Sequence, residues 1–309
     1  MDKVFTVAEV VIPILVAILL GIYARRRAVI SPEGNRGLQQ FVMKFGLPCV
    51  LFTSCLTAEL DAGALSSMAM VLPLMLCSAL WAFRWGRKRY PYHNLPMLFA
   101  AQETGMLGIP LFIILFGAGQ AYRMGMLDLV QALVACPAIA ILSADTGENP
   151  TPAAIAKKTM TSPVLVMSLA GLVLNLSGAA AWLDGIGVGG IIRETTSFLA
   201  QPVSAAILFS VGYNFSVSGE NRAAIFRISA FHFALQAVFC LLIQAGLLLV
   251  PGVEPGIRWA VLLYCTLPAS FLAPSLGKTE DDAAVAAGVC SVLTVVCMVI
   301  FSVIAAVAV

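Results

Sequence analysis

The chain alternates between long apolar runs and short polar stretches. A helix that crosses a membrane needs about 20 mostly apolar residues, and ten runs approach or exceed that length. They cover residues 4–23, 38–57, 63–83, 95–116, 124–143, 162–182, 195–215, 225–249, 257–275 and 283–308. The pattern predicts an all-α polytopic membrane protein with ten transmembrane helices, in contact with the lipid bilayer.

Basic residues gather in alternate polar stretches, and this orients the predicted helices. Thirteen would share one side: Arg25, Arg26, Arg27, Arg36, Arg84, Arg87, Lys88, Arg89, Lys157, Lys158, Arg222, Arg227 and Lys278. The other side has Lys3, Arg123, Arg193 and Arg258, and Lys44 falls inside the second run. Cytoplasmic loops are enriched in Lys and Arg. We therefore expect a multi-pass protein of the cell (inner or plasma) membrane with both termini outside.

The two halves of the chain share a pattern. The run from Pro13 to Gly21 matches the run from Pro163 to Gly171 at five of nine positions. Two further proline pairs follow in the same order, Pro48 with Pro202 and Pro110 with Pro268. Each half, residues 1–150 and 151–309, would hold five helices. The second would thus insert with the opposite orientation, as in the inverted repeats of many secondary transporters.

The fourth and ninth runs contain residues that break helices. Gly105, Gly108 and Pro110 interrupt the fourth, and Pro268 and Pro274 interrupt the ninth. Proline removes a helical hydrogen bond, and freed backbone groups are tolerated in a membrane only against protein or a wet cavity. Breaks at corresponding positions of two halves indicate a solute-binding site, while ordinary proline kinks remain the alternative.

Polar side chains lie close to both breaks. Glu103 immediately precedes the first, although a charged side chain at the bilayer centre costs about 3 kcal/mol. It is either a proton, cation or substrate site or a structural carboxyl group. Asp128 and Gln131, three residues apart on one helix face, would reach the first break if their helix packs there. Thr266 and Ser270 flank the second break, where their hydroxyl groups would bind freed backbone groups or a substrate.

Composition narrows the function further. Only 11% of residues are charged and 60% are hydrophobic, whereas soluble domains average about 25% charged. A net charge of +2 gives no reason to expect nucleic-acid binding. The eight cysteines have no metal-ligand spacing, so neither a metal nor a cofactor is expected. The start of the chain lacks a cleavable-signal pattern. His93 and His232 do not form the motifs of membrane-embedded serine or zinc proteases, so we expect no enzyme.

The residues at the breaks resemble those of the auxin efflux carrier family, which includes plant PIN auxin exporters and bacterial malonate-type carriers. Glu103–Leu111 is similar to the family's Asn-x-Gly-x-x-Gly-x-Pro-Leu element. Leu267–Lys278 resembles its second proline-containing crossover, and Asp128–Gln131 resembles its Asp-x-x-Asn element. The resemblance covers nearly the whole chain. Glu103 and Gln131 stand where the family usually has Asn, and the acid is compatible with proton or sodium coupling.

The resemblance implies a fold shared with bile-acid-type sodium symporters. The first, second, sixth and seventh predicted helices would form a scaffold, through which two copies of the chain would pair as a homodimer. Helices 3–5 and 8–10 would form a moving core in which broken helices 4 and 9 cross.

Together these features predict a secondary transporter that carries a small solute, an organic anion such as a carboxylate, by elevator-type alternating access. The predicted substrate-binding residues are Gly105, Gly108, Pro110, Gln131, Thr266, Pro268 and Ser270. Glu103 and Asp128 are the predicted ion-coupling residues, for H⁺ or Na⁺. A cation/proton antiporter, a channel and a membrane sensor are the alternatives.

Overall fold

The computed structural model describes residues 2–58, 61–144, 157, 160–215 and 221–308. Its helices are α1 (Asp2–Arg26), α2 (Pro32–Phe41), α3 (Leu47–Leu56), α4 (Ala62–Trp81), α5 (Arg87–Arg89), α6 (Leu95–Ala100), α7 (Ile109–Phe116), α8 (Ala121–Ala144), α10 (Pro163–Leu176), α11 (Ala179–Gly185), α12 (Val188–Ala200), α13 (Val203–Asn214), α14 (Arg222–Leu247), α15 (Pro255–Thr266) and α16 (Glu280–Ala308). Short π-helical turns η1 (Val42–Gly46), η2 (Ala82–Gly86) and η3 (Thr104–Gly108), and 3₁₀ turns η4 (Ala118–Gln120) and η5 (Ala273–Leu276), lie between them. Within these ranges β structure is limited to one isolated bridge, so the predicted all-α class is confirmed.

Helix is present in each of the ten predicted segments. Among the described residues, five continuous stretches are long and apolar enough to cross a membrane alone. They are Ala62–Arg89, Ala118–Ser143, Val188–Asn214, Arg222–Leu247 and Glu280–Ala308. The protein is therefore a polytopic α-helical membrane protein, and the number of ten crossings stays a prediction.

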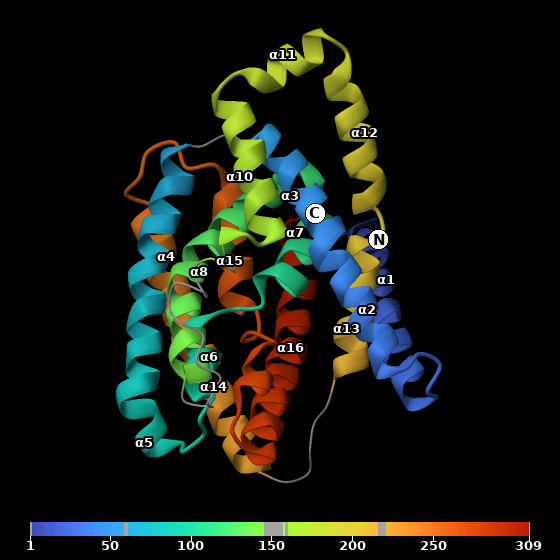
Figure 1. Ribbon diagram of the computed structural model, residues 1–309. Coiled ribbons are helices and arrows are strands. Elements are labelled where there is room, and N and C mark those ends of the chain that lie inside the picture. Colours follow the sequence, from blue (N-terminus) through green and yellow to red (C-terminus); the bar gives the residue numbers. More distant parts are fainter. Residues whose placement is uncertain (1, 59–60, 145–156, 158–159, 216–220, 309) are drawn as a thin grey trace.

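The sixth segment differs from the predicted single span over 162–182. α10 ends at Leu176, and α11 bends away from it by 79°, at the top of the molecule in Figure 1. Gly178, just before α11, has a φ of +72°. A glycine in this left-handed conformation commonly ends a helix, which an apolar run alone does not reveal.

Large apolar side chains cover the outside of the molecule. More than half of the surface of Leu19, Leu176, Phe198, Leu241 and Val299 is exposed. Contiguous apolar surface of this kind is unusual on soluble monomers. Such a surface requires contact with lipid tails instead of water.

Basic loops meet at one end of the molecule, the lower end in Figure 1. Asn221, before α14, donates a hydrogen bond to Asp281 in the first turn of α16. The backbone N–H of His93 donates to Asp282 at 3.0 Å, and Arg87 donates to the His93 carbonyl at 2.6 Å. Three loops that the charge pattern assigned to one side thus lie together, while their cytoplasmic assignment stays a prediction.

Glycines allow two pairs of helices to touch at the backbone. Gly21 of α1 faces the carbonyl of Phe209 in α13, and Gly171 of α10 faces the carbonyl of Phe52 in α3. A Cβ atom at either position would overlap that oxygen. These are the two glycines that end the matching runs of the two halves, so the same small residue serves α1–α13 and α10–α3 contact.

Replacing Gly21 with alanine is expected to destabilise the protein because the added methyl group must push α1 away from α13. Overpacking of this kind costs about 1–3 kcal/mol. Gly37 of α2 is the matched control, since its added Cβ would meet nothing within 4 Å and alanine favours a helix. Thermal melting of the purified variants should give a lower Tm for Gly21→Ala but not for Gly37→Ala, and equal values would contradict this packing.

Candidate functional site

The fourth segment is interrupted between α6 and α7. α6 ends at Ala100, and Ala101 is extended, with φ −153° and ψ 145°. The backbone then passes through η3, where the N–H of Ile109 bonds to the carbonyl of Thr104, five residues back. The sequence placed the break at Gly105–Pro110, but the unwound residues lie earlier, at 101–103. Pro110 falls in the first turn of α7, where its missing N–H is tolerated.

The ninth segment is interrupted just after α15. α15 ends at Thr266, and Leu267 is extended, with φ −63° and ψ 149°. The next residue, Pro268, disfavours helical conformation at the position before it. The chain stays non-helical until Leu272, after which η5 begins with Ala273 and Pro274. This break lies where the sequence predicted it.

The two unwound segments pair with each other. The N–H of Glu103 donates to the carbonyl of Pro268 at 2.8 Å, and the N–H of Ser270 donates to the carbonyl of Ala101 at 3.0 Å. Gln102 and Ala269 form the antiparallel bridge between them. Unsatisfied backbone groups within a membrane are costly, and each break here supplies partners for the other. We call this paired region the crossing.

Gln131 of α8 braces the crossing from the side. Its Oε1 accepts from the backbone N–H of Gln102 at 3.0 Å and from the hydroxyl of Tyr264 at 2.9 Å. Its Nε2 donates to the Gln102 carbonyl at 3.0 Å and to Oδ1 of Asp128 at 2.8 Å. One side chain therefore binds both backbone groups of Gln102, which no helix satisfies, and it also binds Tyr264 and Asp128.

Glu103 links the two broken segments through its carboxylate. Only 8% of the residue is exposed. Oε1 accepts from the backbone N–H of Met106 at 3.3 Å, capping η3, and Oε2 accepts from the N–H of Phe271 at 2.6 Å. Charge-assisted hydrogen bonds are roughly twice as strong as neutral ones. The buried carboxyl group is thus held by backbone donors from both segments.

The predicted glycine and proline positions shape the close approach. Gly108 lies where a Cβ atom would come within 2.6 Å of the end of the Leu267 side chain, so a larger residue would require that side chain to shift. Gly105 is half-buried and has more room, with Leu47 the nearest neighbour of an added Cβ at 3.8 Å. Pro110 and Pro268 are both buried.

The predicted hydroxyl groups are engaged locally. Thr266 donates to the carbonyl of Leu263 at 2.7 Å, a bond within its own helix. The hydroxyl oxygen of Ser270 accepts from the N–H of Leu272 at 3.3 Å, which leaves its hydrogen free to donate. Of the two, Ser270 is the better placed to meet a solute.

A further polar group at the crossing was missed from the sequence. The Gln102 side chain reaches His232 of α14 at 3.2 Å. With its amide turned the other way, it donates to the carbonyls of Leu267 and Pro268 at 3.1 and 3.2 Å and accepts from Gln236. His232 and Gln236 lie four residues apart, which places them on one helix face. That spacing was the available indication of a shared role.

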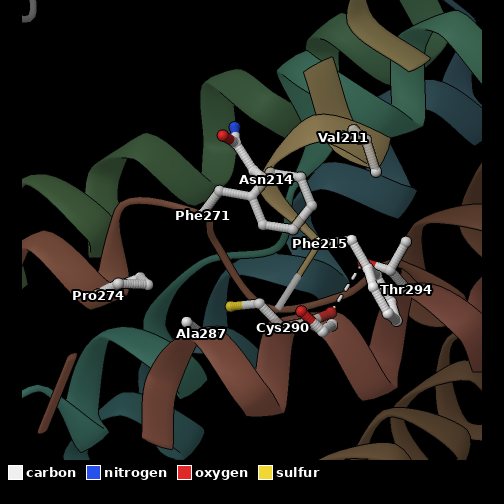
Figure 2. Close-up of a pocket in the computed structure, with 9 residues that line it drawn as sticks. Val211, Asn214, Phe215, Phe271, Pro274, Ala287, Cys290 and Thr294 are labelled. Atoms are coloured by element: carbon white, nitrogen blue, oxygen red, sulfur yellow. Dashed lines mark hydrogen bonds between the residues drawn. The ribbon is translucent and has the colours of Figure 1, made fainter. Parts of the chain in front are cut away.

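A cavity of about 240 Å³ lies beside the crossing. Figure 2 shows Ala287, Cys290 and Thr294 along one face of α16, with Phe271 from the second break and Asn214 from α13 nearby. Thr294 donates to the Cys290 carbonyl at 2.8 Å, so its hydrogen is used within α16. This inner cavity is the right size for a small solute and includes Phe271, whose N–H binds Glu103.

An α-helical membrane protein in which two broken helices pair beside a cavity has the architecture of a secondary transporter. The chain belongs to the membrane transport protein family, whose model matches residues 6–309. This confirms the identification with auxin efflux carrier-like transporters made from the crossing motifs.

A curated relative agrees with this assignment. An uncharacterized transporter of Methanothermobacter thermautotrophicus is 25% identical over 284 residues, covering 88% of each chain. Its description gives no substrate.

Replacing Gln131 with leucine should destabilise the crossing, because it leaves the backbone N–H of Gln102 and the Tyr264 hydroxyl without the partners they have here, while the Gln102 carbonyl keeps the N–H of Thr104. Each buried group left unpaired costs about 1–3 kcal/mol. Gln131→Glu keeps an accepting oxygen but places a carboxyl oxygen against Asp128 and the Gln102 carbonyl, so a loss is expected here too. Exposed Gln40 is the control, and a Tm for Gln131→Leu no lower than that of Gln40→Leu would argue against the brace.

Proposed function

We propose that the protein is a secondary transporter of a small organic anion bearing a carboxylate, coupled to protons through Glu103. The observation that supports this most directly is the position of the Glu103 carboxylate. It accepts hydrogen bonds from the backbone N–H groups of Met106 and Phe271, one from each broken segment. Backbone donors at the start of a helical segment are a natural anion site. Glu103 therefore occupies a site that would suit the carboxylate of a substrate.

Competition between the two carboxylates would provide the coupling. Two negative charges at one buried site repel strongly because the local dielectric constant is low. A proton on Glu103 weakens its acceptor bonds, and its side chain then leaves the two amides to the incoming anion. One proton would thus accompany each bound anion.

The crossing is built to move as one body. Its two segments are joined by backbone bonds and braced by Gln131. At its lower end, Asn94 donates to the carbonyls of Ala273 and Asp282 at 3.0 and 2.9 Å. These bonds tie the starts of α6 and α16 to the second break. In an elevator cycle such a core would slide against a scaffold formed by the first, second, sixth and seventh predicted segments. The driving ion would be H⁺ rather than Na⁺.

A second candidate function, cation/proton exchange, is favoured by one observation. Asp128 is bound at 2.8 Å by Gln131, which also binds the backbone of Gln102, the residue before Glu103, and two buried carboxyl groups at one crossing would suit a cation. Proteoliposomes containing a pH-sensitive dye, challenged with sodium or potassium, separate the two candidates. Proton movement triggered by either cation without an organic anion would favour exchange.

Glu103→Gln is expected to abolish the pH dependence of transport. Wild-type uptake should rise as the pH falls, because binding of the anion requires a proton on Glu103, while the neutral amide needs none. The measurement is uptake into proteoliposomes of a radiolabelled carboxylate, chosen by thermal-shift screening of mono- and dicarboxylates, indoles and amino acids.

Glu194→Gln is the matched control, since Glu194 is an exposed residue of α12 far from the crossing in sequence. It should retain the wild-type pH profile. A wild-type rate that is the same at every pH, or a Glu103→Gln profile that follows wild type, would rule out coupling through Glu103.

A further inference from the structure

A second and larger cavity opens at the end of the molecule where the basic loops meet. Its volume is about 790 Å³, and Arg25, Ser31, Asn35, Arg36 and Tyr213 are among its lining residues. We call it the mouth cavity. It shares Asn214, Pro274 and Ala287 with the inner cavity. The two cavities are therefore adjacent, and a solute in the mouth cavity lies next to the inner cavity beside the crossing.

The mouth cavity carries positive charge that no carboxylate among its described lining residues offsets. Its described lining residues include Arg25 and Arg36 but neither Asp nor Glu. Arg36 approaches Glu33 at 3.7 Å, but both side chains are at least 70% exposed. Such exposed pairs contribute little, so the Arg36 charge remains effective.

Arg25 is held in a fixed position. Its Nη1 donates to the carbonyls of Phe215 at 3.0 Å and Tyr213 at 3.4 Å, at the end of α13. The Tyr213 hydroxyl in turn donates to the carbonyl of Ile30 at 2.8 Å. Both contacts use one nitrogen, and among the described residues no group is seen to accept from the other guanidinium donors, so we expect those donors to bind a ligand. A fixed guanidinium fork suits a carboxylate or a phosphate.

A buried polar side chain in the wall also indicates a ligand. Asn35 is 2% exposed and donates to Oδ1 of Asn214 at 3.2 Å. Its own Oδ1 is buried and has no hydrogen-bond partner among the described residues. Buried polar groups are rarely left unpaired, so either a water that donates to this oxygen and to the anion, or the hydroxyl group of a hydrogen phosphate ion, would complete the site.

We propose that the mouth cavity is a binding site for an oxyanion, carboxylate or phosphate, anchored by Arg25 and assisted by Arg36. The anion would be either a free solute or the headgroup of an anionic lipid. A role in loading the inner cavity rests on the proposed transport function, whereas the binding site itself does not.

The test measures binding to the full-length protein in nanodiscs by isothermal titration calorimetry, with sodium succinate and sodium phosphate as probes. In phosphatidylcholine nanodiscs, Arg25→Gln should weaken binding roughly tenfold or more, as expected for losing a charged hydrogen bond. Arg25→Lys, which keeps the charge, should lose less. Arg36→Gln should weaken binding less than Arg25→Gln. It should also leave α13 undisturbed, because the bonds to the end of α13 are made by Arg25. Arg26→Gln removes the same charge from the neighbouring exposed residue and should bind like wild type.

Lipid composition distinguishes the two sources of the anion. If phosphatidylglycerol in the nanodisc competes with the probes in wild type but not in Arg25→Gln, the site takes a headgroup; if it does not compete, the site takes the free anion. Equal losses for Arg25→Gln and Arg26→Gln, or no probe or lipid binding sensitive to Arg25, would overturn the proposal. Glu103→Gln should leave binding at the mouth intact even if it alters transport, so failure of one proposal is distinguishable from failure of the other.

Discussion

The structure depends on one constraint, that a peptide group inside a membrane must find a hydrogen-bond partner within the protein. A continuous helix satisfies this constraint by its own hydrogen bonds. Two segments are not helical, Ala101–Glu103 and Leu267–Ser270. They satisfy it by pairing with each other and with Gln131. Because neither break is satisfied alone, the two halves of the chain must come together for either to be stable. The proposed functional centre is therefore also a place where the fold is specified.

Much of this arrangement was predictable from the sequence, because membranes restrict structure severely. Apolar length marked the helices, and the helix-breaking residues Pro110 and Pro268 marked the two interrupted segments. The sequence did not indicate where the backbone of the fourth segment unwinds. Pro110 is accommodated in the first turn of α7, and the π-helical turn over Thr104–Gly108 absorbs the irregularity. The outcome depends on which carbonyls the ninth segment offers, which is a property of the folded molecule.

The polar residues follow the same division. Sequence spacing put Asp128 and Gln131 on one face, yet it did not indicate that Gln131 would bind both the backbone N–H and the carbonyl of Gln102. Nor did it connect Gln102 with His232 and Gln236, which lie more than a hundred positions away in the chain. Contacts between distant segments carry no local pattern. The bend after Leu176 was missed for a simpler reason, since Gly178 interrupts an otherwise uniform apolar run.

The Glu103 carboxylate has a thermodynamic consequence as a tethered ligand. A group attached to the site competes at an effective concentration that is on the order of millimolar even for short flexible links, and it never diffuses away. In the proposed mechanism an external anion must compete with this tethered group, so its measured dissociation constant would exceed its intrinsic value for the vacant site. Selectivity would then favour solutes that offer contacts beyond the carboxylate, because the carboxylate alone gives them no advantage over the protein's own side chain.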